Sequence, residues 1–300
     1  MFNGFLYLAT VLIWGTTWYA IKLQLGVVDI EVSMLYRFAL ACIVMWLIMG
    51  RRLQPINGKD HLFCFAQGAT LFSFNFLCFY TATQTITSGL LAVVFSFATV
   101  MNALNGWWVF GQKPSIRVLL GSAIGLTGIT ALFAPEFSGE MKPELLQGLG
   151  LATLGTWLFS MGNMISVRHQ KKGLRPPTTN SWGLLYGVLI LLLLTGLGDA
   201  QYNFDMSWQY SASLGYLAVF GTVIAFTTYL LLVGRIGADK AAYSTVLFPV
   251  VALLMSSWLE GYQWSMMAFV GLALVIAGNL VIFAKIPSRL KFLKRNLPAT

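Results

Sequence analysis

Residues 107–133 read WWVFGQKPSIRVLLGSAIGLTGITALF, and residues 257–283 read SWLEGYQWSMMAFVGLALVIAGNLVIF. When the two stretches are aligned without a gap, a tryptophan, three glycines and a phenylalanine coincide. A second match places LYLATVLIWG (6–15) over LGLATLGTWL (149–158), with Trp14 on Trp157. Because both matches run in the same order and divide the chain near its midpoint, they predict an internal repeat.

The composition places this repeat in a membrane. The chain has 300 residues, of which 57% are hydrophobic and only 10% are charged. Soluble domains average about 25% charged residues, so the composition excludes an ordinary soluble fold. One crossing of a bilayer needs about 20 apolar residues. The apolar runs predict ten transmembrane helices, at 4–22, 31–50, 61–82, 88–110, 116–134, 146–168, 178–197, 210–233, 240–259 and 266–284.

The charges predict the orientation of these spans. Most basic residues lie in alternate connectors, whereas most acidic residues lie in the others. Basic connectors face the cytoplasm, so we expect both termini on that side. Each half holds five spans, an odd number, so the second half must enter the membrane from the opposite face. We predict an all-α membrane protein with two inverted five-helix repeats, 1–140 and 141–285, and a basic tail, 286–300, that lies on anionic cytoplasmic headgroups.

Several motifs carry a resemblance to a known family. They are WGTTWYAIK (14–22) in the first span, YRF (36–38) in the second, and the glycine-rich fifth and tenth spans. With the two five-span halves, they resemble EamA-type transporters of the drug/metabolite transporter superfamily over nearly the whole chain. The resemblance implies an inner-membrane carrier whose cavity is lined by spans one, three, four, six, eight and nine. Members mostly export amino acids, metabolites or toxic amphipathic compounds. Gln112 departs from the family pattern, which often has an acidic residue there, and the ninth span instead ends near Glu260.

Polar and aromatic residues within the predicted spans are candidates for the substrate cavity. Trp14 and Trp18 share one face of the first span because they are four residues apart. Amide groups in hydrocarbon need partners, so mid-span asparagines should face a wet cavity or, alternatively, bind neighbouring helices together. An amphipathic wall of this kind suits flat, weakly polar or cationic solutes. The candidates are Trp14, Trp18, Asn75, Tyr80, Phe95, Thr99, Asn102, Trp157, Asn163, Tyr229 and Tyr243.

Two sequence features predict special backbone geometry. Pro249 in the ninth span leaves the carbonyl group of Thr245 without its helical partner, so we expect a kink there, either static or acting as a hinge. Gly121 and Gly125 form a G-x-x-x-G motif in the fifth span, which permits close helix approach. That approach can occur within the bundle or at a dimer face, so both a monomer and a homodimer are compatible with the sequence.

Two cations break the alternation of charge, on the predicted outer side. Lys22 ends the first span, and Arg37 lies within the second. Either residue can attract a substrate carboxylate or pair with Asp29, Glu31 or Glu260. For Lys22, pairing or contact with the outer headgroups is the favoured interpretation.

The sequence also limits the chemistry. No Asp or Glu lies deep in a predicted span, and no metal-ligand cluster, phosphate-binding loop or nucleophile–base set is apparent. We therefore expect no catalytic residues, no metal, no cofactor and no nucleic-acid partner, and we favour uniport or exchange over proton coupling. The predicted function is export of small amphipathic metabolites, such as amino acids, across the inner membrane by alternating access. The alternatives are a non-transporting sensor or assembly protein and, less favoured, a lipid-modifying enzyme.

Overall fold

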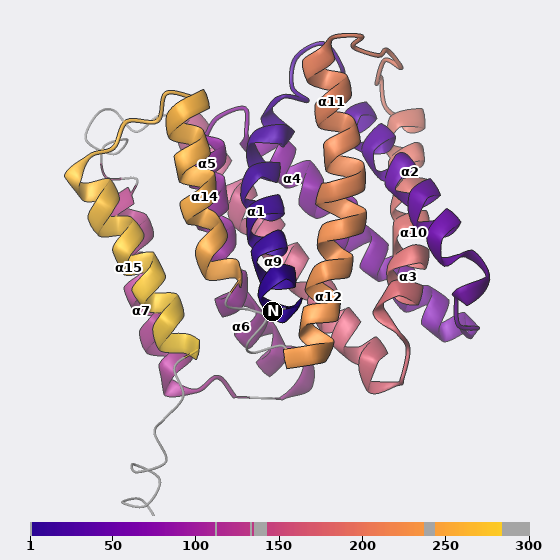
Figure 1. The fold of residues 1–300 in the computed structure, drawn as a ribbon, viewed down its shortest axis with the longest axis horizontal. Coiled ribbons are helices and arrows are strands. Elements are labelled where there is room, and N and C mark those ends of the chain that lie inside the picture. The colour runs from indigo at the N-terminus through magenta and orange to yellow at the C-terminus, as the bar shows by residue number, and fades with distance from the viewer. Residues whose placement is uncertain (1, 112, 133, 135–142, 237–243, 284–300) are drawn as a thin grey trace, which may run out of the picture.

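The computed structural model describes residues 2–111, 113–132, 134, 143–236 and 244–283, and all regular structure in these ranges is helical. Figure 1 shows the helices as a bundle with most axes roughly parallel. In chain order they are α1 (Phe2–Lys22), α2 (Ile30–Met49), η1 (Gly50–Arg52), α3 (Gly58–Leu71), α4 (Phe74–Ala82), α5 (Ser88–Ser96), α6 (Ala98–Phe110), α7 (Ile116–Leu132), α9 (Pro143–Lys171), α10 (Pro176–Leu197), α11 (Trp208–Tyr216), η2 (Leu217–Ile224), α12 (Ala225–Ile236), α14 (Ser244–Leu259) and α15 (Met266–Phe283).

Every predicted apolar run falls mainly on helix where the structure describes it. In the described part of the chain, six stretches are long and apolar enough to cross a membrane: Asn3–Lys22, Ile30–Arg52, Gly58–Ala82, Ser88–Phe110, Pro176–Leu197 and Trp208–Tyr229. Ile116–Leu132, Leu247–Leu259 and Met266–Val281 are shorter apolar helices. Gln112, the predicted start of the ninth span at 240 and the basic tail 286–300 lie outside the described residues.

Three of the long stretches are irregular partway along. The chain leaves helical geometry between α3 and α4, where the Ser73 hydroxyl lies 3.2 Å from a carbonyl oxygen of α3 and another of α10. At Phe97, α5 ends and α6 begins. Between α11 and α12, the segment Leu217–Ile224 is a π-helix. Such interruptions free backbone groups from the regular ladder, and in membrane proteins they are tolerated inside the bundle or beside a cavity.

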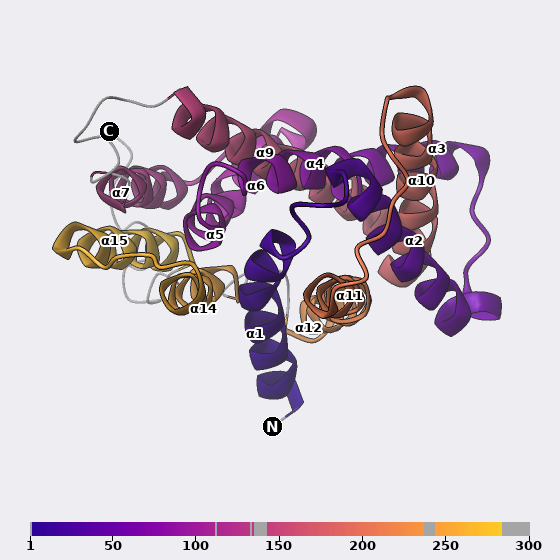
Figure 2. The ribbon, with the colours of Figure 1, turned by 90° about the horizontal axis from the view of Figure 1, so that it is seen from above.

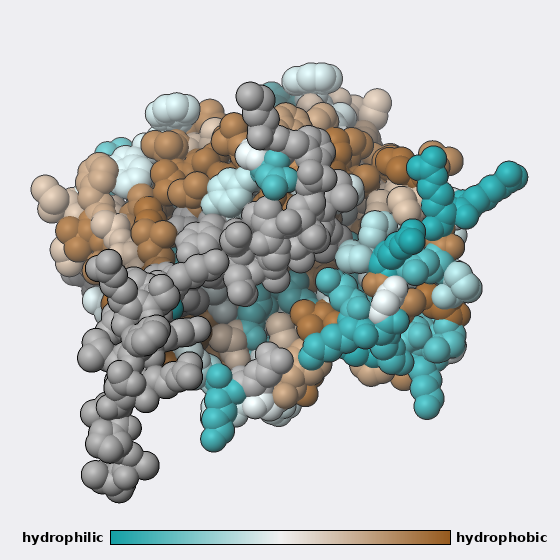
Figure 3. Space-filling view, turned by 60° about the horizontal axis from the view of Figure 1, so that its bottom comes forward, coloured by the Kyte–Doolittle hydropathy of each residue, from teal (hydrophilic) through white to brown (hydrophobic). Residues whose placement is uncertain are grey.

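The outer surface of the bundle is rich in large apolar side chains. Leu47, Leu197 and Trp258 are 80%, 87% and 77% exposed. Polar side chains such as Asn75 and Gln67, by contrast, are fully buried. Figure 3, with the bottom of the bundle forward, shows hydrophilic side chains gathered at that end and apolar surface along the sides. This distribution suits a protein whose sides face lipid tails and whose ends face water.

Helices α7 and α15 pack closely as a pair at one side of the bundle (Figures 1 and 2). Glycines make this contact close: a Cβ atom on Gly128 would lie 2.6 Å from the carbonyl oxygen of Gly271. A Cβ atom on Gly278 would lie 2.5 Å from the carbonyl oxygen of Gly121. The glycine motif of the fifth span therefore packs against α15 of the same chain. Small residues allow this close approach of two helices.

Candidate functional site

A cavity of about 40 Å³ lies at the centre of the helices that surround α1. Since one water needs about 10–15 Å³ of such space, the cavity in this conformation has room only for a few waters. Its wall comes from seven helices of both halves of the chain, and η2 contributes to it as well. The lining residues are Trp14, Thr17, Trp18, Ile21, Arg37, Asn75, Phe76, Phe79, Phe95, Phe159, Gly221, Phe226 and Phe248.

Helix α1 contributes one continuous face to this cavity. Trp14, Thr17, Trp18 and Ile21 follow the i, i+3, i+4, i+7 spacing that places side chains on one side of a helix. Trp14 packs against Phe226 with ring centroids 5.5 Å apart. The two tryptophans and the threonine of this apolar span therefore line the interior of the bundle.

The backbone irregularities of the bundle lie at the level of the cavity. Asn75 and Phe76 follow the break between α3 and α4, and Phe95 precedes the break at Phe97. Gly221 belongs to the π-helix, and Phe248 adjoins Pro249, which lies inside α14. Interruptions of this kind recur where membrane helices form a binding site near the bilayer centre.

Aromatic rings form most of the wall. Trp18 contacts Phe79 and Phe95 with ring centroids 5.4 and 5.1 Å apart, and Phe95 contacts Phe159 at 4.7 Å. The inter-ring angles are between 57° and 82°, in the edge-to-face range that aromatic pairs favour. The cavity therefore has an apolar, shape-adaptable lining.

Three side chains of this lining have polar atoms without a partner among the described residues. They are the indole Nε1 of Trp18, both amide atoms of Asn75 and the Nε of Arg37. Trp18, Asn75 and Arg37 are 6%, 0% and 2% exposed. A buried polar group left unpaired costs about 1–3 kcal/mol. Such groups are rare in folded proteins, so their convergence on one cavity makes it the candidate binding site.

Arg37 is held by weak contacts only. Its Nη1 donates a hydrogen bond of 3.3 Å to the Tyr80 hydroxyl, and its guanidinium lies 4.5 Å from the centroid of the Phe76 ring. Within the described ranges it forms no ion pair. Gly221 leaves room beside it, since a Cβ atom there would lie 3.8 Å from Nη2 of Arg37 and only 2.8 Å from Cγ2 of Thr17.

The structure places some of the predicted cavity residues at this site and others elsewhere. Trp14, Trp18, Asn75 and Phe95 line the cavity. Tyr80 binds Arg37 behind the wall, and Tyr229 packs against Trp14 with centroids 5.1 Å apart.

The remaining candidates that the structure describes do not line it. Asn163 donates a hydrogen bond of 3.3 Å to Asn102, which links α9 to α6 and is the helix-joining alternative of the prediction. Thr99 and Trp157 are absent from the cavity wall. Tyr243 lies outside the described residues, as does the side chain of Thr245.

Phe159, two positions beyond Trp157, is the residue of α9 that lines the cavity. Two positions turn a helix by about 200°, so the repeat alignment selected the wrong face of α9. Apart from Phe95, the phenylalanines of the cavity were not predicted, because the sequence does not distinguish them among the 22 of the chain. Their sequence neighbours were the only features that could have indicated them as cavity residues: Phe79 lies one turn after Asn75, and Phe248 adjoins Pro249.

An ion pair connects the two halves of the chain close to one end of the cavity. Nζ of Lys22, directly after the cavity residue Ile21, lies 2.9 Å from Oε1 of Glu260. The Ser88 backbone N–H donates to Oε2 of the same carboxylate at 3.2 Å, and the Ser88 hydroxyl also binds it. Burial by itself raises the pKa of the Glu260 carboxyl, but the hydrogen bonds from Lys22 and Ser88 outweigh it, so the pKa lies below its usual value. Glu260 is thus ionised here, and pairing is the role the structure gives Lys22.

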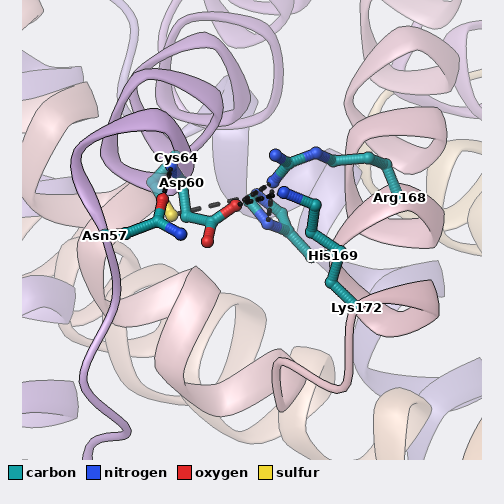
Figure 4. Close-up of polar contacts among 6 residues, drawn as sticks. All are labelled: Asn57, Asp60, Cys64, Arg168, His169 and Lys172. Carbon is teal, nitrogen blue, oxygen red and sulfur yellow. Dashed lines mark hydrogen bonds and ion pairs between the residues drawn. The ribbon is translucent and has the colours of Figure 1, made fainter.

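A second ion-pair cluster connects the halves at the opposite end of the bundle (Figure 4). The carboxylate of Asp60, in the first turn of α3, lies 2.5 Å from Nη1 of Arg168 and 3.4 Å from Nζ of Lys172. Asn57 caps α3 by accepting the Asp60 backbone N–H at 2.9 Å. Asp60 is 4% exposed. Asp60 is not predictable as part of an ion pair from the sequence, because a lone Asp in a basic connector carries no local signal.

A larger hollow of about 550 Å³ lies between α7, α9 and the α5–α6 segment. Its polar groups are hydroxyls that are satisfied within their own helices: Thr153 donates to the Leu149 carbonyl, and Thr156 donates to that of Ala152. Leu126 on its wall is 59% exposed. A hollow with satisfied hydroxyls and exposed leucine suits lipid tails, so the central cavity is the better candidate site.

Comparison with known proteins agrees with this architecture. The sequence model of the EamA-like transporter family matches residues 2–134 and 146–284. A probable amino-acid metabolite efflux pump of Escherichia coli (strain K12) is 24% identical, with 92% of this chain and 93% of that protein aligned. An uncharacterised transporter of Bacillus subtilis (strain 168), YoaV, is 22% identical over 85% of this chain and 87% of its own length. A solved crystal structure superposes with a TM-score of 0.68 at 16% identity, covering 98% of this chain and 99% of the other, so the two share a fold.

Proposed function

Since this chain belongs to the EamA-like transporter family, we propose that it is a secondary transporter that exports small amphipathic metabolites, such as amino acids or related organic solutes. The names of its relatives indicate a multi-pass membrane transporter rather than an enzyme. Alternating access across the inner membrane, with both termini in the cytoplasm, is the mechanism and orientation we propose.

The observation that carries the proposal is the central cavity. It lies between interrupted helices, and Trp18, Asn75 and Arg37 bring to it polar atoms that have no partner among the described residues. Buried unpartnered groups are costly unless a ligand or water satisfies them. A small solute with both polar and apolar parts would satisfy them and fill the aromatic wall.

Ten crossings in two inverted five-helix halves are part of the proposal. In the sequence, Gly121 aligns with Gly271, and Gly128 aligns with Gly278. In the structure, Gly128 packs on Gly271 and Gly121 packs on Gly278. A two-fold axis generates this exchange, because residue i of one copy meets residue j of the other while j meets i. The crossed glycine contacts therefore support a pseudo-two-fold relation between the halves.

The two ion pairs supply the gates that alternating access needs. Lys22–Glu260 joins the halves at the end where α1 terminates, and Asp60–Arg168 joins them at the other end. Both are formed here, and the cavity is too small for an organic solute. We propose that this is the occluded state, and that breaking either pair lets the halves part at one end while the other pair stays closed.

A transport assay in proteoliposomes tests the proposal. Counterflow with a panel of labelled amino acids and related solutes should be saturable with the wild-type protein. Trp14→Ala should slow it at least about tenfold, the usual effect of removing one well-packed aromatic contact. Trp258→Ala is the matched control, because this tryptophan is 77% exposed and lies away from the cavity. A solute that binds without ever moving would favour a sensor instead.

A further inference from the structure

The central cavity contains an arginine with no acidic partner among the residues that the structure describes, and we propose that Arg37 is the anchor for a carboxylate on the transported solute. The inference rests on the transport function proposed above and narrows its substrate class. The solute would be a small organic acid or amino acid with one carboxylate and an apolar body.

The first argument is charge balance. An arginine side chain stays protonated at any physiological pH, and Arg37 is 2% exposed. The two buried carboxylates at the ends of the bundle, Asp60 and Glu260, each have basic partners. Among the described residues Arg37 has only a 3.3 Å hydrogen bond to a neutral tyrosine and two aromatic rings. A buried charge without a counter-ion is costly, and an arriving carboxylate would remove that cost through a two-pronged hydrogen-bonded pair.

The second argument is the set of groups beside Arg37. The Trp18 indole nitrogen can only donate, and the Asn75 amide can donate and accept. Both line the same cavity and lack partners among the described residues. The indole N–H and the amide N–H suit carboxylate oxygens. The amide oxygen suits an N–H or O–H group on the same solute, such as the ammonium of an amino acid.

The third argument is the apolar wall. Phe79, Phe95 and Phe159 pack edge to face around the cavity and present carbon atoms to a ligand. They would hold the body of the solute while Arg37 holds its charged end. A cationic solute, which the sequence alone had suggested, fits less well, because Arg37 would repel it and no carboxylate in the described part of the chain lines the cavity.

Binding to the purified full-length protein in detergent tests the inference, with matched acids and amides as probes. 3-Phenylpropionate and L-phenylalanine carry the carboxylate, whereas 3-phenylpropionamide and L-phenylalaninamide lack it. We expect the acids to bind roughly tenfold to a hundredfold more tightly than the amides, the range for a hydrogen bond to a charged group. Arg37→Gln should abolish this preference, and Arg37→Lys should restore part of it. Arg52→Gln, at an exposed arginine beyond α2, is the matched control and should retain the preference.

Several results would overturn the inference. They are equal binding of acids and amides, no binding of either, or a full preference for acids in Arg37→Gln. If Arg37→Gln fails to fold, Trp18→Phe removes the indole N–H donor while keeping an aromatic ring, and the acid–amide comparison on the wild-type protein still decides. Counterflow separates the inference from the transport function. If solutes without a carboxylate are transported, and Arg37→Gln does not change their transport, the transport function is supported and the role of Arg37 as a carboxylate anchor is rejected. If acids bind in an Arg37-dependent way but are not transported, the carboxylate anchor is supported and the transport function is rejected.

Discussion

The ammonium group of Lys22 at the end of α1 lies 2.9 Å from the carboxylate of Glu260, directly after α14. The Glu260 side chain is 1% exposed, whereas that of Lys22 is 39% exposed. The pair therefore has one buried and one wet partner, and it lies one residue beyond the cavity residue Ile21. This position suits a gate that closes one end of the cavity and can open at modest cost.

Removing the lysine should weaken this closure. Lys22→Ala leaves the buried Glu260 carboxylate with only Ser88, so we expect it to cost about 1–3 kcal/mol and to lower the apparent melting temperature in detergent. Glu260→Gln should have a smaller effect, because the neutral amide still accepts from Ser88. The double exchange Lys22→Glu with Glu260→Lys should recover part of the loss. An unchanged melting temperature in Lys22→Ala would show that the pair does not hold the halves together.

The pH dependence of stability should report the Glu260 carboxylate. Its pKa lies below the usual value of 4.5, so the stabilisation by the ionised group is fully present above that value. It is lost as the pH falls through the lowered pKa of the folded state. The melting temperatures of the wild-type protein and Glu260→Gln should therefore differ by a constant amount between about pH 8 and pH 5.5, and should converge as the pH falls through the lowered pKa of the folded carboxyl. The exposed Glu144→Gln should show no such convergence, and a difference that already disappears near pH 6 would contradict the ionised assignment.

A native cysteine can report opening at the other end. Cys64 lies one helical turn beyond Asp60 and is fully buried. Its Sγ atom lies 3.8 Å from Nε2 of His169. Asp60→Asn weakens the ion pair to Arg168, so we expect faster maleimide labelling of Cys64 in a background where Cys42 and Cys78 are serine. Lys59→Gln, at the exposed neighbouring position, should leave the rate unchanged. Equal labelling in both variants would remove this cluster as a gate.

The crossed glycine contacts predict a sharp steric effect. Gly128→Ala places a methyl group 2.6 Å from the Gly271 carbonyl oxygen, inside van der Waals contact. We expect it to push α7 away from α15 and to reduce the yield of monodisperse protein. Gly150→Ala is the matched control, because a methyl group there meets nothing within 4 Å and alanine favours the helix. If the two variants behave alike, the close packing of α7 on α15 is not needed for the fold.

Helix positions followed well from the sequence, because apolar length and breaker residues are local signals. The run 88–110 was predicted with both ends where the structure has them, and the run 266–284 ends one residue beyond α15. The face of α1 was also predictable, because Trp14 and Trp18 repeat at helical spacing. The breaks at Ser73 and Phe97 and the π-helix around Gly221 were not, since they depend on contacts with other helices, such as the Ser73 hydroxyl on α10.

The site was predicted only in part for a similar reason. Asn75 stood out as a polar residue in an apolar run, and the structure puts it on the cavity wall. Asn163 stood out equally but binds Asn102. Sequence cannot distinguish these cases, because a mid-span amide needs a partner either way and only packing decides whether that partner is a side chain. The Asp60–Arg168 pair was missed because its members are 108 residues apart.

The most direct test of the account is sided labelling of the cavity itself. In a cysteine-free background, Thr17→Cys places one thiol on the cavity wall, and a membrane-impermeant maleimide is applied from either side of oriented vesicles. With Lys22→Ala the ion pair at the proposed outer end is lost, and we expect labelling from outside only. With Asp60→Asn the ion pair at the opposite end is weakened, and we expect labelling from the cytoplasmic side only. Labelling from the same side in both variants, or from neither side in either, would contradict a central site with alternating gates.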